Sequence, residues 1–230
     1  MSKTVLITGA NGNLGTAAVK KFLEVGYQVI GVDHSGSHLG FAESNKGFEL
    51  QSIDLTDESA VGLFVKNIIA KYNTIDAALL LAGGFASGNL FTTGGDDLKK
   101  MYTLNFETVY FIANPLFQHM LLKGYGRLVF IGARPALKAE QGKTAVAYAL
   151  SKSLLFKLSE IMNAEAKGKN VVSSVVTIST LDTEQNRISM PHGNPDNWVK
   201  VEQASEIMEF ICSDKSLPLR ESIFKVYNNA

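Results

Sequence analysis

The stretch "AYALSK", residues 147–152, holds two side chains that could do chemistry together. Tyr148 and Lys152 are four positions apart, and on a helix this spacing puts both side chains on one face. A tyrosine hydroxyl titrates near about 10, and a neighbouring ammonium group favours its ionised form. A tyrosine tuned in this way can act as a general acid or base. The spacing therefore predicts proton transfer at Tyr148, with a chance pairing on a helix as the alternative.

A glycine-rich run near the start of the chain, "TGANGNLG", could bind a phosphate. Glycines at 9, 12 and 15 let the backbone turn tightly and approach a pyrophosphate, whose charge is stabilised at the next helix N-terminus. We expect this turn to hold a dinucleotide, with an ordinary glycine-bearing turn as the alternative. The expected contacts are Gly9, Asn11, Gly12, Asn13, Leu14 and Gly15.

Acidic residues follow the next two strand-like runs. Asp33 ends "YQVIGVD", where a carboxylate can accept hydrogen bonds from an adenosine ribose and repel a 2′-phosphate. The stretch "DHSGSHLG" has no Arg or Lys to hold that phosphate, so we expect NAD(H) in preference to NADP(H). Asp54 and Leu55 are expected to line the adenine pocket. For both acids, a helix-capping or turn-capping role is the alternative.

Strand-like and helix-like runs alternate along the whole chain. This pattern predicts an α/β fold, a Rossmann-type doubly wound parallel sheet of about seven strands with helices on both faces. The predicted strands are 4–10, 27–33, 48–54, 75–84, 126–132, 170–178 and 222–227. The predicted helices include 15–26, 56–72 capped by Thr56 or Asp57, 95–122 with a kink or break at Pro115, 144–167 and 206–214. Residues 179–200 are expected to be irregular and functional.

Composition narrows the classes of function. The 230 residues fit one domain over 1–230, and 46% of them are hydrophobic, enough for a sizeable core. Lys plus Arg and Asp plus Glu are both 22, which favours neither nucleic acid nor an anionic membrane as partner. The single Cys212 is expected to be a buried thiol, and the four histidines have no metal-ligand spacing. Without a signal-like or membrane-spanning run, we expect a cytoplasmic protein.

The motifs "TGANGNLG", "DL", "AGG", Asn105 and "YALSK" occur in the order of the short-chain dehydrogenase/reductase family, which the chain resembles over nearly its whole length. The resemblance implies hydride transfer with Tyr148 as acid or base. It implies that Lys152 holds the nicotinamide ribose and lowers the tyrosine pKa, and that Asn105 supports a water relay. Further cofactor contacts implied are Ala82, Gly83, Gly84, Thr180, Leu181 and Thr183. A homodimer or homotetramer through the helices near 95–122 and 144–167 is also implied.

Three positions depart from the family pattern. Leu81 stands where asparagine is usual, and Ile178-Ser179 replaces a proline-glycine pair. Gly132-Ala133 occupies the place of the serine that polarises a substrate carbonyl. Thr144 or Gln141 could supply a hydrogen-bond donor instead.

One branch of the family shares these departures. "LAGGFASGN", "GARPAL" and "TLDTEQNRISMP" resemble the corresponding stretches of dihydropteridine reductases. That resemblance implies reduction of a quinonoid dihydropterin by NADH. A conjugated pterin spreads the incoming charge over its rings, so one acid, Tyr148, is expected to suffice. Residues 179–200 are then a lid over the small-molecule substrate, with Arg187, Met190 and Trp198 facing it; for Trp198, packing beneath the loop is the alternative.

Two other functions stay open at this point, and length decides against a third. One is a carbonyl or quinone reductase of another substrate. A second is a nucleotide-sensing binding protein that has lost catalysis, motivated by the missing serine. A third is a sugar-nucleotide epimerase or dehydratase, whose branch shares the glycine spacing. About 50 residues follow the sixth predicted strand, and this is short for the substrate region of that branch.

Overall fold

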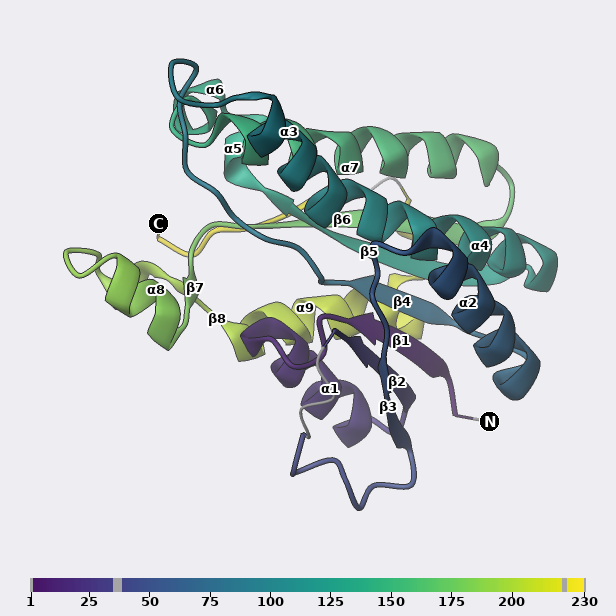
Figure 1. Cartoon of the computed structure of the whole chain (residues 1–230). Helices are drawn as coiled ribbons and strands as arrows, with labels where there is room; N and C mark the ends of the chain where they lie inside the picture. Colours follow the sequence, from purple (N-terminus) through teal and green to yellow (C-terminus); the bar gives the residue numbers. More distant parts are fainter. Residues whose placement is uncertain (1, 35–38, 221–222, 230) are drawn as a thin grey trace.

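The computed structural model describes residues 2–34, 39–220 and 223–229 (Figure 1). Seven strands form one sheet in the order β3-β2-β1-β4-β5-β6-β9, and every neighbouring pair is parallel. The strands are β1 Thr4–Thr8, β2 Gln28–Asp33, β3 Phe48–Ser52, β4 Ala77–Leu80, β5 Tyr125–Ala133, β6 Asn170–Ile178 and β9 Ile223–Val226. The predicted fold class is confirmed. The sequence signal was strong because β1 and β4 are buried along their whole length, which demands continuous apolar runs.

Helices cover both faces of this sheet (Figure 1). On one face lie α2 Glu58–Tyr72, α4 Thr108–Lys123 and α7 Val146–Glu165, and their apolar residues share one core cluster with β4, β5 and β6. On the other face lie α1 Asn13–Glu24 and α9 Val201–Cys212, with a second cluster. Asp57 is the N-cap of α2, since its carboxylate accepts from the Ala60 N–H at 3.0 Å. Of the two predicted caps, Asp57 is therefore the correct one.

The predicted helix over 95–122 is interrupted, but not at Pro115. It consists of α3 Gly95–Tyr102, a π-helical turn at Thr103–Glu107, and α4, which continues through Pro115. Of the kink or break expected at Pro115, the break does not occur there. The wide turn surrounds Asn105, whose side chain is hydrogen-bonded to distant segments. Those long-range contacts hold the irregular turn, and no local sequence signal marks it.

Residues 179–200 are more regular than expected. Two short strands, β7 Leu181–Asp182 and β8 Val199–Lys200, pair in parallel outside the main sheet. Between them are α8 Glu184–Ser189 and a 3-10 turn at Pro195–Asn197. The prediction of an irregular segment was wrong, because side-chain caps from Thr183 and Asn194 stabilise elements too short for periodicity to reveal. The segment projects from the end of β6, beyond the sheet (Figure 1).

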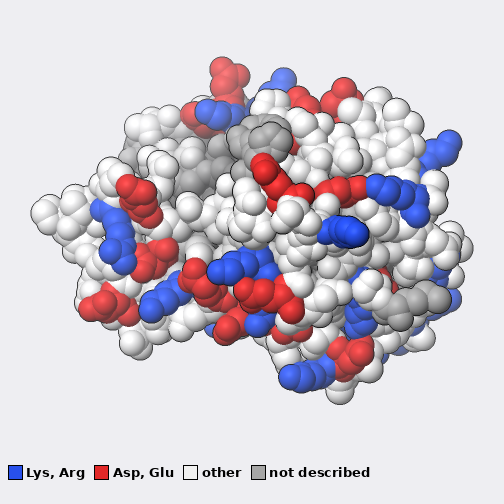
Figure 2. All heavy atoms as spheres, turned by 90° about the horizontal axis from the view of Figure 1, so that it is seen from below, with Lys and Arg blue, Asp and Glu red and all other residues white. Residues whose placement is uncertain are grey.

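The remaining short elements are α5 Arg134–Leu137, α6 Ala139–Gly142 and a 3-10 turn at Asp214–Ser216. Within the described ranges, no helix combines the length and apolarity needed to cross a membrane. Figure 2 shows basic and acidic side chains interspersed over the face seen from below. That mixture agrees with the equal numbers of acidic and basic residues in the sequence.

Candidate active site

The turn between β1 and α1 has the shape of a phosphate cradle. The Gly12 N–H donates to the Gly9 carbonyl at 3.0 Å, and Gly9 has a φ of 66°. A Cβ at position 15 would lie 2.0 Å from the Gly9 oxygen, so this approach of helix and turn requires glycine. Helix α1 has neither a side-chain cap nor an acidic residue in its first turn. Its N–H groups are therefore available to an anion, and the turn fits a dinucleotide pyrophosphate.

The acidic residues predicted to contact the adenosine end lie at the adjoining strand ends. One carboxylate oxygen of Asp33 accepts from the Asn11 N–H at 3.0 Å, which holds this side chain against the glycine-rich turn. Asp54 follows β3 and accepts from the backbone N–H and the hydroxyl of Thr56, at 2.9 and 2.7 Å. These bonds lower the pKa of Asp54. Asp54 thus has the turn-capping role considered from the sequence, and Leu55 beside it is buried.

Tyr148 and Lys152 lie in the first turns of α7, as predicted. The Lys152 ammonium donates to the Ile131 carbonyl at 2.9 Å, and burial lowers the pKa of Lys152 to about 8. Burial also raises the pKa of Tyr148 to about 12. This is opposite to the lowered tyrosine pKa implied by family resemblance. In the protein by itself, the Tyr148 hydroxyl is protonated at neutral pH and can serve as an acid.

Asn105 connects the β4 loop to the helix that carries Tyr148. Its side-chain oxygen accepts from the Gly84 N–H at 2.9 Å, and its amide nitrogen donates to the Gly84 carbonyl at 3.0 Å. The same nitrogen donates to the Ser151 hydroxyl at 3.1 Å, and that hydroxyl donates to the Tyr148 carbonyl at 2.9 Å. Asn105 is fully buried. These bonds link Asn105 to the backbone of Tyr148, whereas Lys152 is bonded separately to the Ile131 carbonyl.

The loop after β4 approaches Asn105 and Lys152 closely. A Cβ at Gly83 would lie 2.6 Å from the Asn105 side-chain oxygen and 3.3 Å from the Lys152 nitrogen. The Ala82 N–H donates to the Thr8 hydroxyl at 3.1 Å, which fixes the loop to the end of β1. Sequence reasoning missed Thr8 and Ser151. In the sequence, the only indication was a hydroxyl side chain beside each motif. The hydrogen-bond partners of Thr8 and Ser151, Ala82 and Asn105, are 74 and 46 positions away.

Phe85, which follows Gly84, was also missed. Its ring packs edge-on against the Tyr148 ring, with 5.0 Å between centroids and 72° between planes. Phe85 is nevertheless 68% exposed. An aromatic side chain that touches the acid and is otherwise open to solvent belongs to the rim of the site.

At the end of β5, Ala133 is buried and offers no hydroxyl. The alternative donor Thr144 is exposed, and its hydroxyl donates to the Gln141 carbonyl at 3.2 Å. Thr144 also accepts from the Gly88 N–H through its backbone carbonyl at 2.9 Å. The position at which the family usually has a serine therefore carries the methyl group of Ala133. The Thr144 hydroxyl is bonded locally, to the Gln141 carbonyl.

The residues expected in the lid have distinct surroundings. Thr183 caps α8, accepting from the Asn186 N–H at 3.2 Å, and Asn186 donates to the Leu181 carbonyl at 2.9 Å. The Thr180 carbonyl accepts from the Val199 N–H at 2.8 Å. Arg187 pairs with Asp182 at 2.6 Å.

Trp198 is 6% exposed, and a Cβ at Gly193 would lie 2.4 Å from its ring. This burial matches the packing alternative for Trp198, whereas Met190 is exposed.

Comparison with known proteins identifies this arrangement. The profile of the short chain dehydrogenases matches residues 3–192. The chain belongs to the short chain dehydrogenase family. This short chain dehydrogenase is an NAD(P)-dependent oxidoreductase, which confirms the family predicted from the motifs and the type of enzyme. Among the residues that the structure describes, no group of three or more His, Cys, Asp or Glu is placed to hold a metal ion.

Named relatives show the range within the family. The chain is 27% identical to a dihydropteridine reductase of Dictyostelium discoideum, over 98% of this chain and 94% of the relative. It is 21% identical to a 3-oxoacyl-(acyl-carrier-protein) reductase FabG of Chlamydia trachomatis, over 98% and 96%.

Two solved structures share the fold. A 4-hydroxyisoleucine dehydrogenase complexed with NADH has a TM-score of 0.88 at 22% identity, covering 99% of this chain and 98% of that one. ElxO with NADP bound has a TM-score of 0.90 at 20% identity, covering 98% and 97%. Both cofactors thus occur among proteins of this fold.

Proposed function

We propose that this short chain dehydrogenase uses NADH to reduce a quinonoid dihydropteridine or a similar conjugated substrate. The observation that carries the proposal is the buried methyl group of Ala133 where a second hydroxyl donor would be expected. A simple ketone concentrates negative charge on one oxygen as it is reduced, and a second donor stabilises that charge. A conjugated ring system spreads the charge and depends less on that donor. The dihydropteridine reductase relative, which matches along nearly the whole chain, supports this substrate class.

The residues of the site have complementary tasks. The bound cofactor supplies a hydride. Tyr148, held protonated by burial, donates a proton to the reduced substrate. Lys152, fixed by the Ile131 carbonyl, is the cation that would hold the nicotinamide ribose. Asn105 fixes the Gly84 loop and, through Ser151, the backbone of Tyr148, and it would support proton resupply through water. Ala82, Thr180, Leu181 and Thr183 would line the nicotinamide end.

NAD(H) is the expected cofactor because Asp33 ends β2, where a carboxylate would accept from the adenosine ribose and repel a 2′-phosphate. The Asn11 N–H holds the Asp33 carboxylate at the glycine-rich turn, and charge repulsion there disfavours NADP(H). Titration by fluorescence should show tighter binding of NADH than of NADPH. Asp33→Ala should narrow that gap. Tighter binding of NADPH by the unaltered protein would contradict the preference.

Two further proposals concern the molecule around the site. Residues 1–230 would form one NAD(P)-binding domain, with 179–200 as a lid over the substrate. The chain would assemble as a homodimer or homotetramer through the helical faces of α3, α4 and α7. Exposed apolar side chains on these helices support that assembly: Leu98, Tyr102, Tyr110, Leu150 and Ile161.

A substrate panel tests the proposed reaction. Oxidation of NADH should be fastest with quinonoid dihydropterin, slower with quinones and slowest with small ketones. Tyr148→Phe is the matched control, since it removes the donated proton and keeps the ring; it should bind NADH normally and turn over slowly. Fastest turnover of a simple ketone would identify a carbonyl reductase instead. Binding of NADH without turnover of any substrate would identify a nucleotide-sensing protein.

A further inference from the structure

Phe85 is an exposed aromatic side chain in direct contact with the acid of the site. Its ring centroid is 5.0 Å from that of Tyr148, in an edge-to-face arrangement, while 68% of the residue remains accessible. Leaving most of a phenyl group in water forfeits the stabilisation that burial would give. The fold does not need this ring in either of its two core clusters.

The backbone holds Phe85 rigidly on both sides. The preceding residue, Gly84, has its N–H and its carbonyl bonded to the Asn105 side chain. Three residues later, the Gly88 N–H donates to the Thr144 carbonyl at 2.9 Å, and the Val146 N–H donates to the Gly88 carbonyl at 2.8 Å. This bridge ties the loop to the start of α7, two residues before Tyr148. Phe85 and Tyr148 are therefore positioned together, before any substrate binds.

We propose that Phe85 is the specificity-determining residue that makes this site prefer flat, conjugated substrates. The inference rests on the proposed function and extends it. A substrate atom that takes the Tyr148 proton must come within hydrogen-bond distance of that hydroxyl, so a two-ring substrate extends into the space beside the Phe85 ring. There a planar π-system gains both buried area and an aromatic contact. Such contacts add roughly 0.5–1.5 kcal/mol beyond area burial, equivalent to about a 2- to 10-fold preference.

The test compares ligands that differ in flatness. 2-Naphthol and 2-decalol are both bicyclic alcohols, one planar and the other saturated and puckered. Their dissociation constants are measured by calorimetry on the NADH-loaded protein, for the wild type, Phe85→Leu and Phe85→Tyr. Leucine keeps an apolar side chain without a π face, and tyrosine keeps the face. We expect Phe85→Leu to weaken 2-naphthol binding about 2- to 10-fold, to change 2-decalol binding less than twofold, and Phe85→Tyr to retain the preference.

Several outcomes would overturn the inference. Equal weakening of both ligands in Phe85→Leu would mean that the ring supplies apolar area alone. A shifted pH profile of turnover with an unchanged ligand ratio would mean that Phe85 only positions Tyr148. A change in molar mass with an unchanged ratio would make the ring part of a subunit interface. Because the ligand ratio needs no turnover, absence of pteridine reductase activity would refute the proposed function and leave this test intact.

Discussion

A hydroxyl added at Ala133 should change which substrates the site reduces. Ala133→Ser adds a hydroxyl at the end of β5, and the side chain there is buried. Loss of a comparable donor costs roughly 3 kcal/mol in acyl-transfer enzymes, so its gain could raise ketone turnover up to about a hundredfold. We expect a rise smaller than this upper bound. Quinonoid pterin turnover should change little.

The measurement for Ala133→Ser is a ratio. Ketone turnover is divided by quinonoid pterin turnover, for the variant and the wild type, at saturating NADH. A flat or lower ratio in a folded variant with normal NADH affinity would contradict the role given to the missing hydroxyl. The shape of the 179–200 segment would then be the better explanation of substrate choice.

The buried ammonium group of Lys152 lowers the free energy of unfolding at neutral pH. Its pKa falls from 10.5 to about 8 on folding, so below pH 8 the folded protein bears the full cost of a buried ammonium group. That cost, roughly 3 kcal/mol, is relieved as pH rises from about 8 to 10.5, where the unfolded chain binds more protons than the folded one.

Lys152→Met should therefore stabilise the protein while abolishing turnover. At pH 7 we expect the free energy of unfolding to rise by about 1–3 kcal/mol. Loss of the hydrogen bond from Lys152 to the Ile131 carbonyl offsets part of this gain. Urea unfolding of both proteins at pH 7 and near pH 10.5 checks this. The advantage of the variant should shrink at the higher pH. A gain independent of pH, or no gain, would contradict the buried charge as its cause.

At the scale of elements, the sequence predicted what local patterns specify. Strand β6 was predicted with its observed bounds, because the residues at 171–178 are apolar or small and all of them are buried. The π-helical turn at Thr103–Glu107 was not predicted, since it depends on the bonds from Asn105 to Gly84 and Ser151. The contact between Phe85 and Tyr148 joins residues far apart in the chain. Sequence motifs thus indicated Tyr148, Lys152 and Asn105. Thr8, Ser151 and Phe85 were recognised only from their long-range contacts in the structure.

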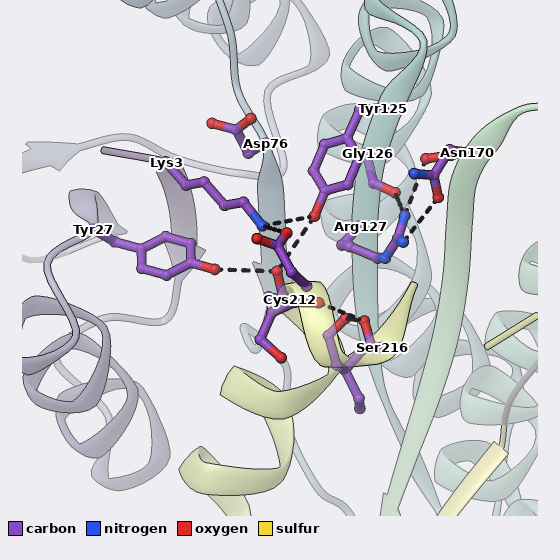
Figure 3. Close-up of polar contacts among 12 residues, drawn as sticks. Lys3, Tyr27, Asp76, Tyr125, Gly126, Arg127, Asn170, Cys212 and Ser216 are labelled. Carbon is purple, nitrogen blue, oxygen red and sulfur yellow. Dashed lines mark hydrogen bonds and ion pairs between the residues drawn. The ribbon is translucent and has the colours of Figure 1, made fainter. Parts of the chain in front are cut away.

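The amino ends of the strands carry a polar network of a different kind (Figure 3). The hydroxyls of Tyr27 and Tyr125 both donate to the carbonyl of Cys212, the last residue of α9, at 3.1 and 3.4 Å. Tyr125 also accepts from the Lys3 ammonium at 3.2 Å, and Arg127 stacks on its ring at 4.8 Å. The residue before β2 and the first residue of β5 are thereby linked to the end of one helix.

A double-mutant cycle on this network should be non-additive. Tyr27→Phe and Tyr125→Phe keep both rings and should each cost about 1 kcal/mol, because the other hydroxyl still satisfies the Cys212 carbonyl. The double variant leaves that carbonyl without either donor and should cost at least about 1 kcal/mol more than the sum. Urea denaturation of the four proteins measures this. Agreement of the sum with the double variant would show that the two bonds act independently.

At the scale of the whole molecule, the proposed site and the network of Tyr27, Tyr125 and Cys212 lie at opposite ends of one parallel sheet. The glycine-rich turn, Ala133 and the Gly83 loop follow the carboxyl ends of β1, β5 and β4. Lys3, Asp76 and Tyr125 lie at the amino ends (Figure 3). Variants in the amino-end network should therefore change the free energy of unfolding more than cofactor affinity.

The proposed assembly makes a prediction that belongs to the whole molecule. Leu150 on α7 is 53% exposed, and along α3, the π-helical turn and α4 the rings of Tyr102, Phe106 and Tyr110 form a row with centroids 5.3 and 5.9 Å apart. An apolar helical face of this kind is expected to be covered by a second copy of the chain. Leu150→Glu places a charge on that face and should weaken association at least about tenfold, since burying an unpaired carboxylate is costly.

Leu63→Glu is the matched control for Leu150→Glu, because Leu63 is 61% exposed on α2, outside the proposed interface. Sedimentation velocity over a concentration series should show wild type and Leu63→Glu as dimers or tetramers of the 24.9 kDa chain. Leu150→Glu should dissociate toward the single chain, with an unchanged circular dichroism spectrum. A wild type that sediments as a single chain, or equal dissociation of both variants, would contradict an interface on these helices.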